Sequence, residues 1–229
     1  MRDKLYPKTK EHSDTIFDLK PQNLYIMLNN HNIMVKIHNT KKEIIQLLLS
    51  HKNREFTIRN IAQNISIDYK TVHGVMQELI RNNLVHAKKI GQTVLCSINP
   101  NEFNEDIFIA ELSRRENLLK NKDLSSLYSY FKDIKEPFFI LLLFGSYASG
   151  KNRKGSDIDL MLITNNENTK EKIKSKIALI PWEIHLTQFN SEEFIAMLKT
   201  TEFNVGKEAF YNNIILYGIE DYYRMIQYV

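Results

Sequence analysis

Two apolar segments joined by a short glycine-containing loop constrain the fold of this chain more than any other feature. The first segment, residues 139–144, leads into the string GSYASGKN, and the second forms part of SDIDLMLI, residues 156–163. A polar and apolar alternation that ends in an apolar run is typical of a strand. Only four residues separate Lys151 from this second strand, so no crossover helix fits between the two strands.

The loop satisfies the P-loop pattern G-x-x-x-x-G-K between Gly145 and Lys151, but the P-loop interpretation fails at two points. The next position needs Ser or Thr, whose hydroxyl binds Mg²⁺, and here it is Asn152. A P-loop also opens a long helix whose N-terminal amides face the phosphates, whereas a strand follows here. A different site chemistry is therefore expected.

Two carboxylates in the second strand provide that chemistry. Side chains two apart on a strand point to the same face, so Asp157 and Asp159 converge while Ile158 and Leu160 pack on the other face. Like charges this close repel, and an apolar sheet is a costly place for them unless a cation is bound. Oxygen ligands of this kind suit Mg²⁺ or Mn²⁺, which in turn bind phosphate oxygens.

The loop supplies groups for a phosphate. Backbone N–H groups after Gly145 and the hydroxyl of Ser146 can hold it, because a residue without a Cβ lets the backbone approach closely. Lys151 and Arg153 add positive charge nearby. Carboxylates and phosphate donors together predict a metal-assisted phosphoryl or nucleotidyl transfer site.

The segment GSYASGKNRKGSDIDLMLI resembles the signature of the DNA polymerase β-like nucleotidyltransferase superfamily, and it is most similar to the minimal nucleotidyltransferases of prokaryotes. The resemblance covers residues 138–163 firmly and extends loosely to the end of the chain. It implies that the Gly-Ser pair holds the phosphates of an NTP, with ATP the expected one. It also implies that Asp157 and Asp159 bind two divalent ions, Mg²⁺ or Mn²⁺.

The family uses a third carboxylate on a later strand to activate the acceptor. After an expected helix over residues 169–180, PWEIHLT alternates, with Glu183 and His185 on one face. Glu183 is the candidate third catalytic and metal-binding carboxylate, although a glutamate stands where aspartate is commoner. His185 is either a proton acceptor near neutral pH or a hydrogen-bonded residue at the rim.

Residues 40–100 predict helix, helix, helix and hairpin. Thr40, Thr57 and Asp68 are candidate caps of three helices, and two apolar strands follow with a turn at Gly91. The segment resembles winged helix-turn-helix DNA-binding domains, in which the third helix enters the major groove and the hairpin tip meets phosphates. The residues predicted to contact nucleic acid are Tyr69, Lys70, His73, Lys88 and Lys89.

The positive charge of the chain is concentrated in this segment. Residues 40–100 contain nine Lys or Arg against four Asp or Glu, whereas the whole chain carries a net charge of only +4. Concentrated positive charge favours DNA or RNA as a partner. A solvated basic face, a dimerisation module and a protein-docking module are the alternatives for this segment.

Other features of the chain indicate a cytoplasmic protein. The one cysteine, Cys96, cannot form an internal disulfide. No apolar stretch reaches the roughly 18 residues of a membrane helix, and the N-terminal residues lack the apolar core of a signal peptide. Neither a membrane association nor export is expected.

We therefore expect an α+β protein in four parts. These are an N-terminal extension that could form a hairpin (1–39), a winged helix-turn-helix (40–100), a helical connector (101–136) and a polymerase β-like nucleotidyltransferase α/β domain (137–229). A monomer and a dimer are both compatible with the sequence.

The expected function is metal-dependent transfer of a nucleoside monophosphate from an NTP to an acceptor hydroxyl. The resemblance implies two classes of acceptor, a protein side chain, as on a partner toxin, and a small molecule such as an antibiotic. The alternative is a DNA-binding transcriptional regulator whose transferase domain senses a nucleotide or is inactive.

Overall fold

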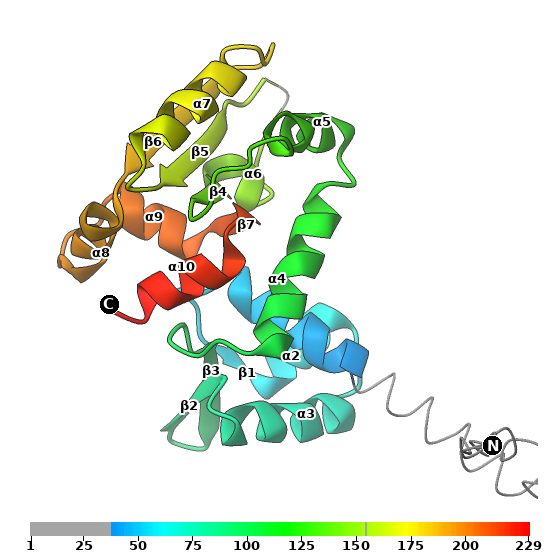
Figure 1. Cartoon of the computed structure of the whole chain (residues 1–229). Coiled ribbons are helices and arrows are strands. Elements are labelled where there is room, and N and C mark those ends of the chain that lie inside the picture. The colour runs from blue at the N-terminus through cyan, green and yellow to red at the C-terminus, as the bar shows by residue number, and fades with distance from the viewer. Residues whose placement is uncertain (1–37, 154) are drawn as a thin grey trace, which may run out of the picture. The chain divides into compact units, whose positions relative to one another are not determined.

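The computed structural model describes residues 38–153 and 155–229 (Figure 1), and the chain divides into two units after Asn39. The hairpin expected near residues 24–37 lies outside the described residues. In the described residues the first helix spans residues 38–49, so Thr40 lies inside the helix and does not cap it, contrary to the prediction. The further elements, in chain order, are β1 (Phe56–Thr57), α2 (Ile58–Ile65), α3 (Tyr69–Arg81), β2 (Val85–Ile90), β3 (Thr93–Ile98), α4 (Glu105–Leu118), α5 (Lys122–Phe131), β4 (Ile140–Phe144), α6 (Gly145–Ala148), β5 (Ile158–Ile163), α7 (Glu167–Ile177), β6 (Ile184–Phe189), α8 (Ser191–Lys199), α9 (Val205–Tyr211), β7 (Asn213–Tyr217) and α10 (Ile219–Ile226).

The protein is of the α+β class, with helices set against two separate sheets. Within the described part of the chain, none of the helices combines the length and the apolar character that crossing a membrane requires.

Within the unit that begins at Thr40, residues 40–100 have the predicted helix, helix, helix, hairpin order of a winged helix. Strands β2 and β3 pair antiparallel from Val85 opposite Ile98 to Ile90 opposite Thr93, and Gly91 turns the chain with φ +60°. The strand order is β1-β3-β2. The sequence did not predict the two-residue strand β1, which pairs Phe56 with Cys96 at the sheet edge.

Helix α3 owes its orientation to an amphipathic sequence. The side chain of Asp68 caps the helix by accepting a hydrogen bond from the backbone N–H of Thr71 at 2.9 Å, as predicted. The buried face has the helical spacing that the sequence indicated. Its buried residues are Val72, Val75, Met76 and Leu79.

The second part is built on a four-stranded sheet in the order β6-β5-β4-β7. Strands β4 and β5 are antiparallel, with Ile140 opposite Ile163 and Phe144 opposite Asp159. This pairing agrees with the short connection between them, which leaves no room for a crossover helix. Strands β5 and β6 are parallel, and α7 forms the connection between them.

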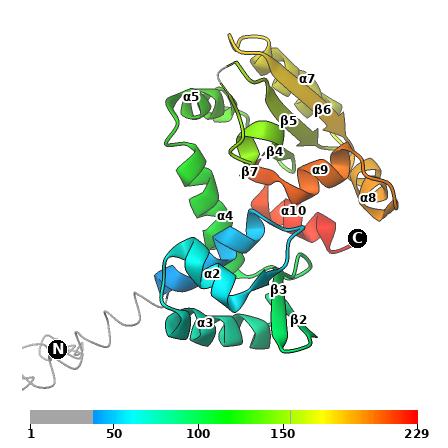
Figure 2. The same cartoon turned by 180° about the vertical axis from the view of Figure 1, so that it is seen from behind.

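Helices cover both faces of this sheet, which Figures 1 and 2 show from opposite sides. Helices α5 and α7 share one apolar core with Leu141, Leu143 and Leu160. The other core contains Leu142 and Met161 together with residues of α8, α9 and α10. The alternation along β4 and β5 therefore divides their side chains between two cores.

The connector predicted over residues 101–136 divides between these cores. Ile107 and Ala110 of α4 pack in the core that also contains the winged-helix residues. Helix α5 instead places Leu124, Leu127 and Phe131 against the sheet. The apolar face of α5 therefore covers the sheet, whereas α4 packs with the winged-helix residues.

A buried polar network joins α4 to β7 and α10. Arg114 contacts the carboxylate of Glu111 at 2.6 Å and donates to the backbone carbonyl of Asn213 at 2.7 Å. The hydroxyl of Tyr223 donates to Glu111 at 2.9 Å, and Lys52 donates to the side-chain oxygen of Asn213 at 3.2 Å. Burial of these charges is compensated by partners on four different segments.

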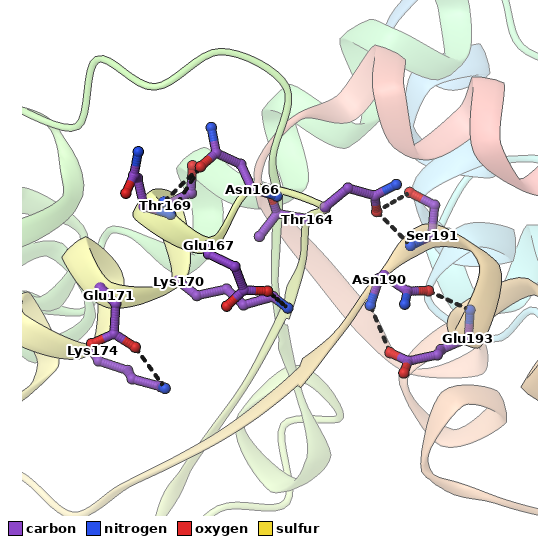
Figure 3. Close-up of polar contacts among 12 residues, drawn as sticks. Thr164, Asn166, Glu167, Thr169, Lys170, Glu171, Lys174, Asn190, Ser191 and Glu193 are labelled. Carbon is purple, nitrogen blue, oxygen red and sulfur yellow. Dashed lines mark hydrogen bonds and ion pairs between the residues drawn. The ribbon is translucent and has the colours of Figure 1, made fainter.

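The turns that leave β5 and β6 are fixed by side-chain caps (Figure 3). Asn166 accepts a hydrogen bond from the N–H of Thr169 at the start of α7. Asn190 and Glu193 form a capping box at the start of α8, with both hydrogen bonds at 2.8 Å. These caps hold the carboxyl ends of the two parallel strands, and the predicted site residues lie at the opposite, amino ends.

Candidate functional site

The turn after β4 is a single helical turn, α6, which begins at Gly145. The N–H of Lys151 donates to the carbonyl of Ser146 at 2.9 Å, and the Ser149 hydroxyl donates to the carbonyl of Gly145 at 3.0 Å. Gly145 has φ +67°, a conformation that favours glycine. The sequence predicted a tight turn here, and the structure gives it as one turn of helix closed by these bonds.

Gly145 is also required because of its neighbour on β5. A Cβ at Gly145 would lie 2.2 Å from Oδ2 of Asp159, and β4 and β5 place Phe144 directly opposite Asp159. The carboxylate therefore occupies the space that any larger residue would need. Sequence reasoning attributed this glycine to phosphate approach and did not detect its contact with the carboxylate.

The two aspartates lie at the amino end of β5, with Asp157 just before the strand and Asp159 within it. Ile158 and Leu160 point into the core formed with α5 and α7, so the predicted alternation is confirmed. The pKa of Asp159 is raised overall. Burial is the largest cause, and the charge of Asp157 acts in the same direction, whereas the nearby His185 lowers the pKa. A bound cation would offset both unfavourable effects.

The parallel register between β5 and β6 sets which residue faces Asp159. Asp159 lies opposite His185, and Ile158 lies opposite Ile184. Nδ1 of His185 is 3.7 Å from Oδ1 of Asp159, and Nε2 is 4.0 Å from Oδ2 of Asp157. The residue on β6 beside Asp159 is thus His185 and not Glu183, the candidate for the third carboxylate.

Glu183 lies one step further out, just before β6. Its side chain is 74% exposed, and its Oε1 is 3.8 Å from Nε2 of His185. Its backbone carbonyl accepts a hydrogen bond of 3.0 Å from the N–H of Ile158, which fixes the main chain at this point. Glu183 therefore lies near His185, which in turn lies near Asp157 and Asp159.

These residues form a set of metal-ligand type. One ligand atom each from Asp157, Glu183 and His185 lies within 4.8 Å of the other two. Two carboxylates and an imidazole suit a divalent cation. The residues present are thus compatible with a divalent ion, but the resemblance implied two ions and placed Asp159, which is not in this group, among their ligands.

Residues 122–221 match the family model of polymerase beta, nucleotidyltransferase. This match supports a nucleotidyltransferase-type function for this part of the chain. It begins at the first residue of α5, in agreement with the packing of α5 on the sheet.

No curated protein matches the chain. Among solved structures, reduced HlyU from Vibrio cholerae N16961 is similar at 18% identity and a TM-score of 0.28, and the similarity covers 41% of this chain and 95% of that chain.

A cavity of about 660 Å³ opens beside the carboxylates of Asp157 and Glu183. Arg153, Asp157 and Glu183 supply charge, while Tyr147 and Trp182 supply aromatic surface. The other lining residues are Asn121, Asp123, Leu124, Asn152, Gly155, Ser156, Ile158 and Pro181. The cavity therefore offers a charged wall and flat apolar surface in one place, a combination that suits a nucleobase and its phosphates.

Several of these cavity residues were not predicted from the sequence. Asn121 and Asp123 come from the start of α5, more than twenty residues before the glycine turn. No local pattern links them to the site, because they reach it only when α5 packs on the sheet. Trp182 had a local signal, since it directly precedes Glu183 in the alternating segment PWEIHLT.

The predicted nucleic-acid-binding residues lie on α3 and β2. Tyr69, Lys70 and His73 are exposed on α3, and the rings of Tyr69 and His73 are 5.7 Å apart. Lys88 and Lys89 are exposed on β2, next to the turn of the hairpin. All five side chains are accessible to solvent.

Proposed function

We propose that the protein transfers a nucleoside monophosphate from an NTP, ATP being the expected one, to an acceptor hydroxyl, with release of pyrophosphate. The observation that carries the proposal is the contact between the glycine turn and the carboxylates. Gly145 leaves the space that the Asp159 carboxylate occupies, and Asp157, two residues earlier in the chain, lines the cavity. The turn proposed to bind phosphate and the acidic residues proposed to bind the ion both lie within residues 122–221, which match the nucleotidyltransferase family model.

The reaction forms a bond from the acceptor oxygen to the α-phosphorus and breaks the bond from that phosphorus to the bridging oxygen. Pyrophosphate leaves, and the acceptor proton passes to Glu183, which lies at the open side of the site. Ser146 and backbone N–H groups of α6 hold phosphate oxygens, and Arg153 adds charge in the cavity. A divalent ion held by the carboxylates, Mg²⁺ or Mn²⁺, would neutralise the triphosphate when bound.

The acceptor is a protein side chain, such as one on a partner toxin, or a small molecule such as an antibiotic. Both present a hydroxyl, and the cavity is open to solvent, so either could approach the α-phosphate. With either acceptor, the same bond to the α-phosphorus is formed and pyrophosphate is released.

We further propose that residues 40–100 bind DNA or RNA. Helix α3 would contact base edges through Tyr69, Lys70 and His73, while the hairpin lysines contact phosphates. The support is the winged-helix order of the elements and the exposure of all five predicted side chains.

The transferase proposal is tested with ATP labelled at the α-phosphate, Mg²⁺ or Mn²⁺, and two acceptor pools: bacterial lysate protein and a panel of hydroxyl-bearing antibiotics. We expect pyrophosphate release and label in one pool, and loss of both in Asp157→Asn and Asp159→Asn. Glu220→Gln is the matched control, since Glu220 is an exposed acidic residue on α10. Wild-type protein that binds ATP yet labels neither pool and releases no pyrophosphate would contradict transfer.

One observation favours the alternative of a nucleotide-sensing regulator. The residue beside Asp159 on β6 is His185 rather than a carboxylate. In that case ATP would change the affinity for DNA without being consumed. A gel-shift titration with mixed genomic fragments, with and without ATP, distinguishes the two functions, and Lys70→Ala compared with Lys199→Ala tests whether the signal comes from α3.

A further inference from the structure

We propose that His185 is a metal ligand, and that Asp157, Glu183 and His185 hold one first-row transition ion, Mn²⁺, Co²⁺ or Zn²⁺, in preference to Mg²⁺. The inference deepens the proposed function, on which it rests, because it names the ion that would serve the NTP. It differs from the expectation for the sequence, in which carboxylates alone bind Mg²⁺ or Mn²⁺.

The register of the sheet places His185 in this position. Parallel pairing sets His185 directly opposite Asp159, and its ring nitrogens lie within 4.0 Å of carboxylate oxygens of Asp157, Asp159 and Glu183. Nε2 faces Asp157 at 4.0 Å and Glu183 at 3.8 Å. Nε2 of His185 is therefore nearly as close to both carboxylates as a third ligand atom of the same ion would be expected to lie.

The separations are close to those of a ligand set. Two ligand atoms each about 2.1 Å from an ion in tetrahedral geometry lie about 3.4 Å apart. The atom pairs here, at 3.8 and 4.0 Å, exceed this by about half an ångström. The side chains of His185 and Glu183 are mostly exposed and that of Asp157 is partly exposed, so small rotations would close the gap without displacing the core.

Asp159 supports the same assignment from the other side of the ring. Its Oδ1 is 3.7 Å from Nδ1 of His185, the nitrogen that faces away from Glu183. A histidine that binds a metal through one nitrogen usually donates its other N–H to a carboxylate, which fixes the ring. Asp159 is placed to accept that hydrogen bond and thereby to orient Nε2.

The donor set determines which ion is preferred. Mg²⁺ prefers oxygen ligands and keeps several waters, whereas an imidazole nitrogen suits the later first-row ions. Affinity for a mixed nitrogen and oxygen set rises from Mn²⁺ to Co²⁺. One nitrogen among the ligands should therefore make binding of Co²⁺ and Mn²⁺ tighter than binding of Mg²⁺.

The test uses the full chain, treated with a chelator and studied without nucleotide. Calorimetry with Mg²⁺, Mn²⁺ and Co²⁺ gives the affinities, and pulsed electron paramagnetic resonance of the Mn²⁺ form detects a coordinated ¹⁴N nucleus. We expect a ¹⁴N coupling in the wild type and its loss in His185→Asp, with Co²⁺ affinity lower by at least about tenfold and Mg²⁺ affinity kept or raised. His86→Asp, an exposed histidine on β2, is the matched control and should change neither measurement.

Absence of ¹⁴N coupling in wild-type protein that binds Mn²⁺ would overturn the proposal, as would equal affinity for Mg²⁺ and Co²⁺. The wild-type spectrum decides the question even if His185→Asp does not fold. These results are separable from the proposed function. A nitrogen-coordinated ion in a protein that transfers no nucleotide would refute the transferase alone, and transfer with Mg²⁺ in a protein without ¹⁴N coupling would refute the ligand alone.

Discussion

Replacing Gly145 by alanine should damage the site more than the same change at Gly150, although both residues have φ +67°. An alanine held at positive φ costs about 1–2 kcal/mol at either position. At Gly150 the new Cβ meets nothing within 4 Å, so this backbone cost is the whole expected loss. At Gly145 the new Cβ would lie 2.2 Å from Asp159, and the carboxylate must retreat by about 0.8 Å to reach even 3.0 Å.

Forcing an extra methyl group into an occupied space costs about 1–3 kcal/mol in addition. We therefore expect Gly145→Ala to lower the free energy of unfolding by about 2–5 kcal/mol and Gly150→Ala by about 1–2 kcal/mol. Because Asp159 moves only in the first variant, that variant alone should bind Mn²⁺ more weakly, by about tenfold or more. Urea denaturation measures the first quantity and calorimetry the second.

The comparison isolates the contact, since both variants carry the same backbone strain. Equal losses of stability with unchanged Mn²⁺ affinity in both would show that Asp159 moves away freely. The explanation of Gly145 as the space for this carboxylate would then be wrong, and only its backbone conformation would remain as the reason for a glycine.

Three further outcomes are expected. Replacing Lys88 and Lys89 by alanine should weaken DNA binding evenly across sequences and lower the salt slope by about one for each lost phosphate contact, as measured by fluorescence anisotropy at several salt concentrations. Glu111→Gln should lower the free energy of unfolding by about 3–5 kcal/mol, because it leaves the buried charge of Arg114 without its partner. Burial lowers the pKa of Lys52 to about 8, so above that pH the unfolded chain holds a proton that the folded chain has lost. Stability should therefore rise with pH above about 8 in the wild type relative to Lys52→Met, in parallel denaturation series.

Local patterns in the sequence were enough to predict most elements of the fold. The short link between β4 and β5 excluded a crossover helix, and the structure pairs these strands antiparallel. The spacing of apolar residues in α3 gave its buried face, and Asp68 gave its cap. Each of these features is set by residues that are close together in the sequence. They can therefore be predicted from local patterns in a single sequence.

The site required information that local patterns do not contain. Alternation showed that Glu183 and His185 share a face, but not which of them lies beside Asp159. That choice depends on the register between β5 and β6, which pairs residues 26 positions apart. Helix α5 was predicted as part of a connector for the same reason, since its contact with the sheet follows from tertiary packing and not from its own pattern.

The buried network explains how a four-residue helix can hold the site in place. Arg114 fixes the carbonyl of Asn213, and Asn213 lies opposite Phe144, the residue just before the glycine turn. Phe144 lies opposite Asp159 on its other side. The start of α6 is therefore held between β5 and β7, and β7 is in turn anchored to α4 by the buried hydrogen bond from Arg114 to the Asn213 carbonyl. Pre-organisation of the carboxylates and the turn thus comes from the strands on either side, since α6 is too short to be stable alone.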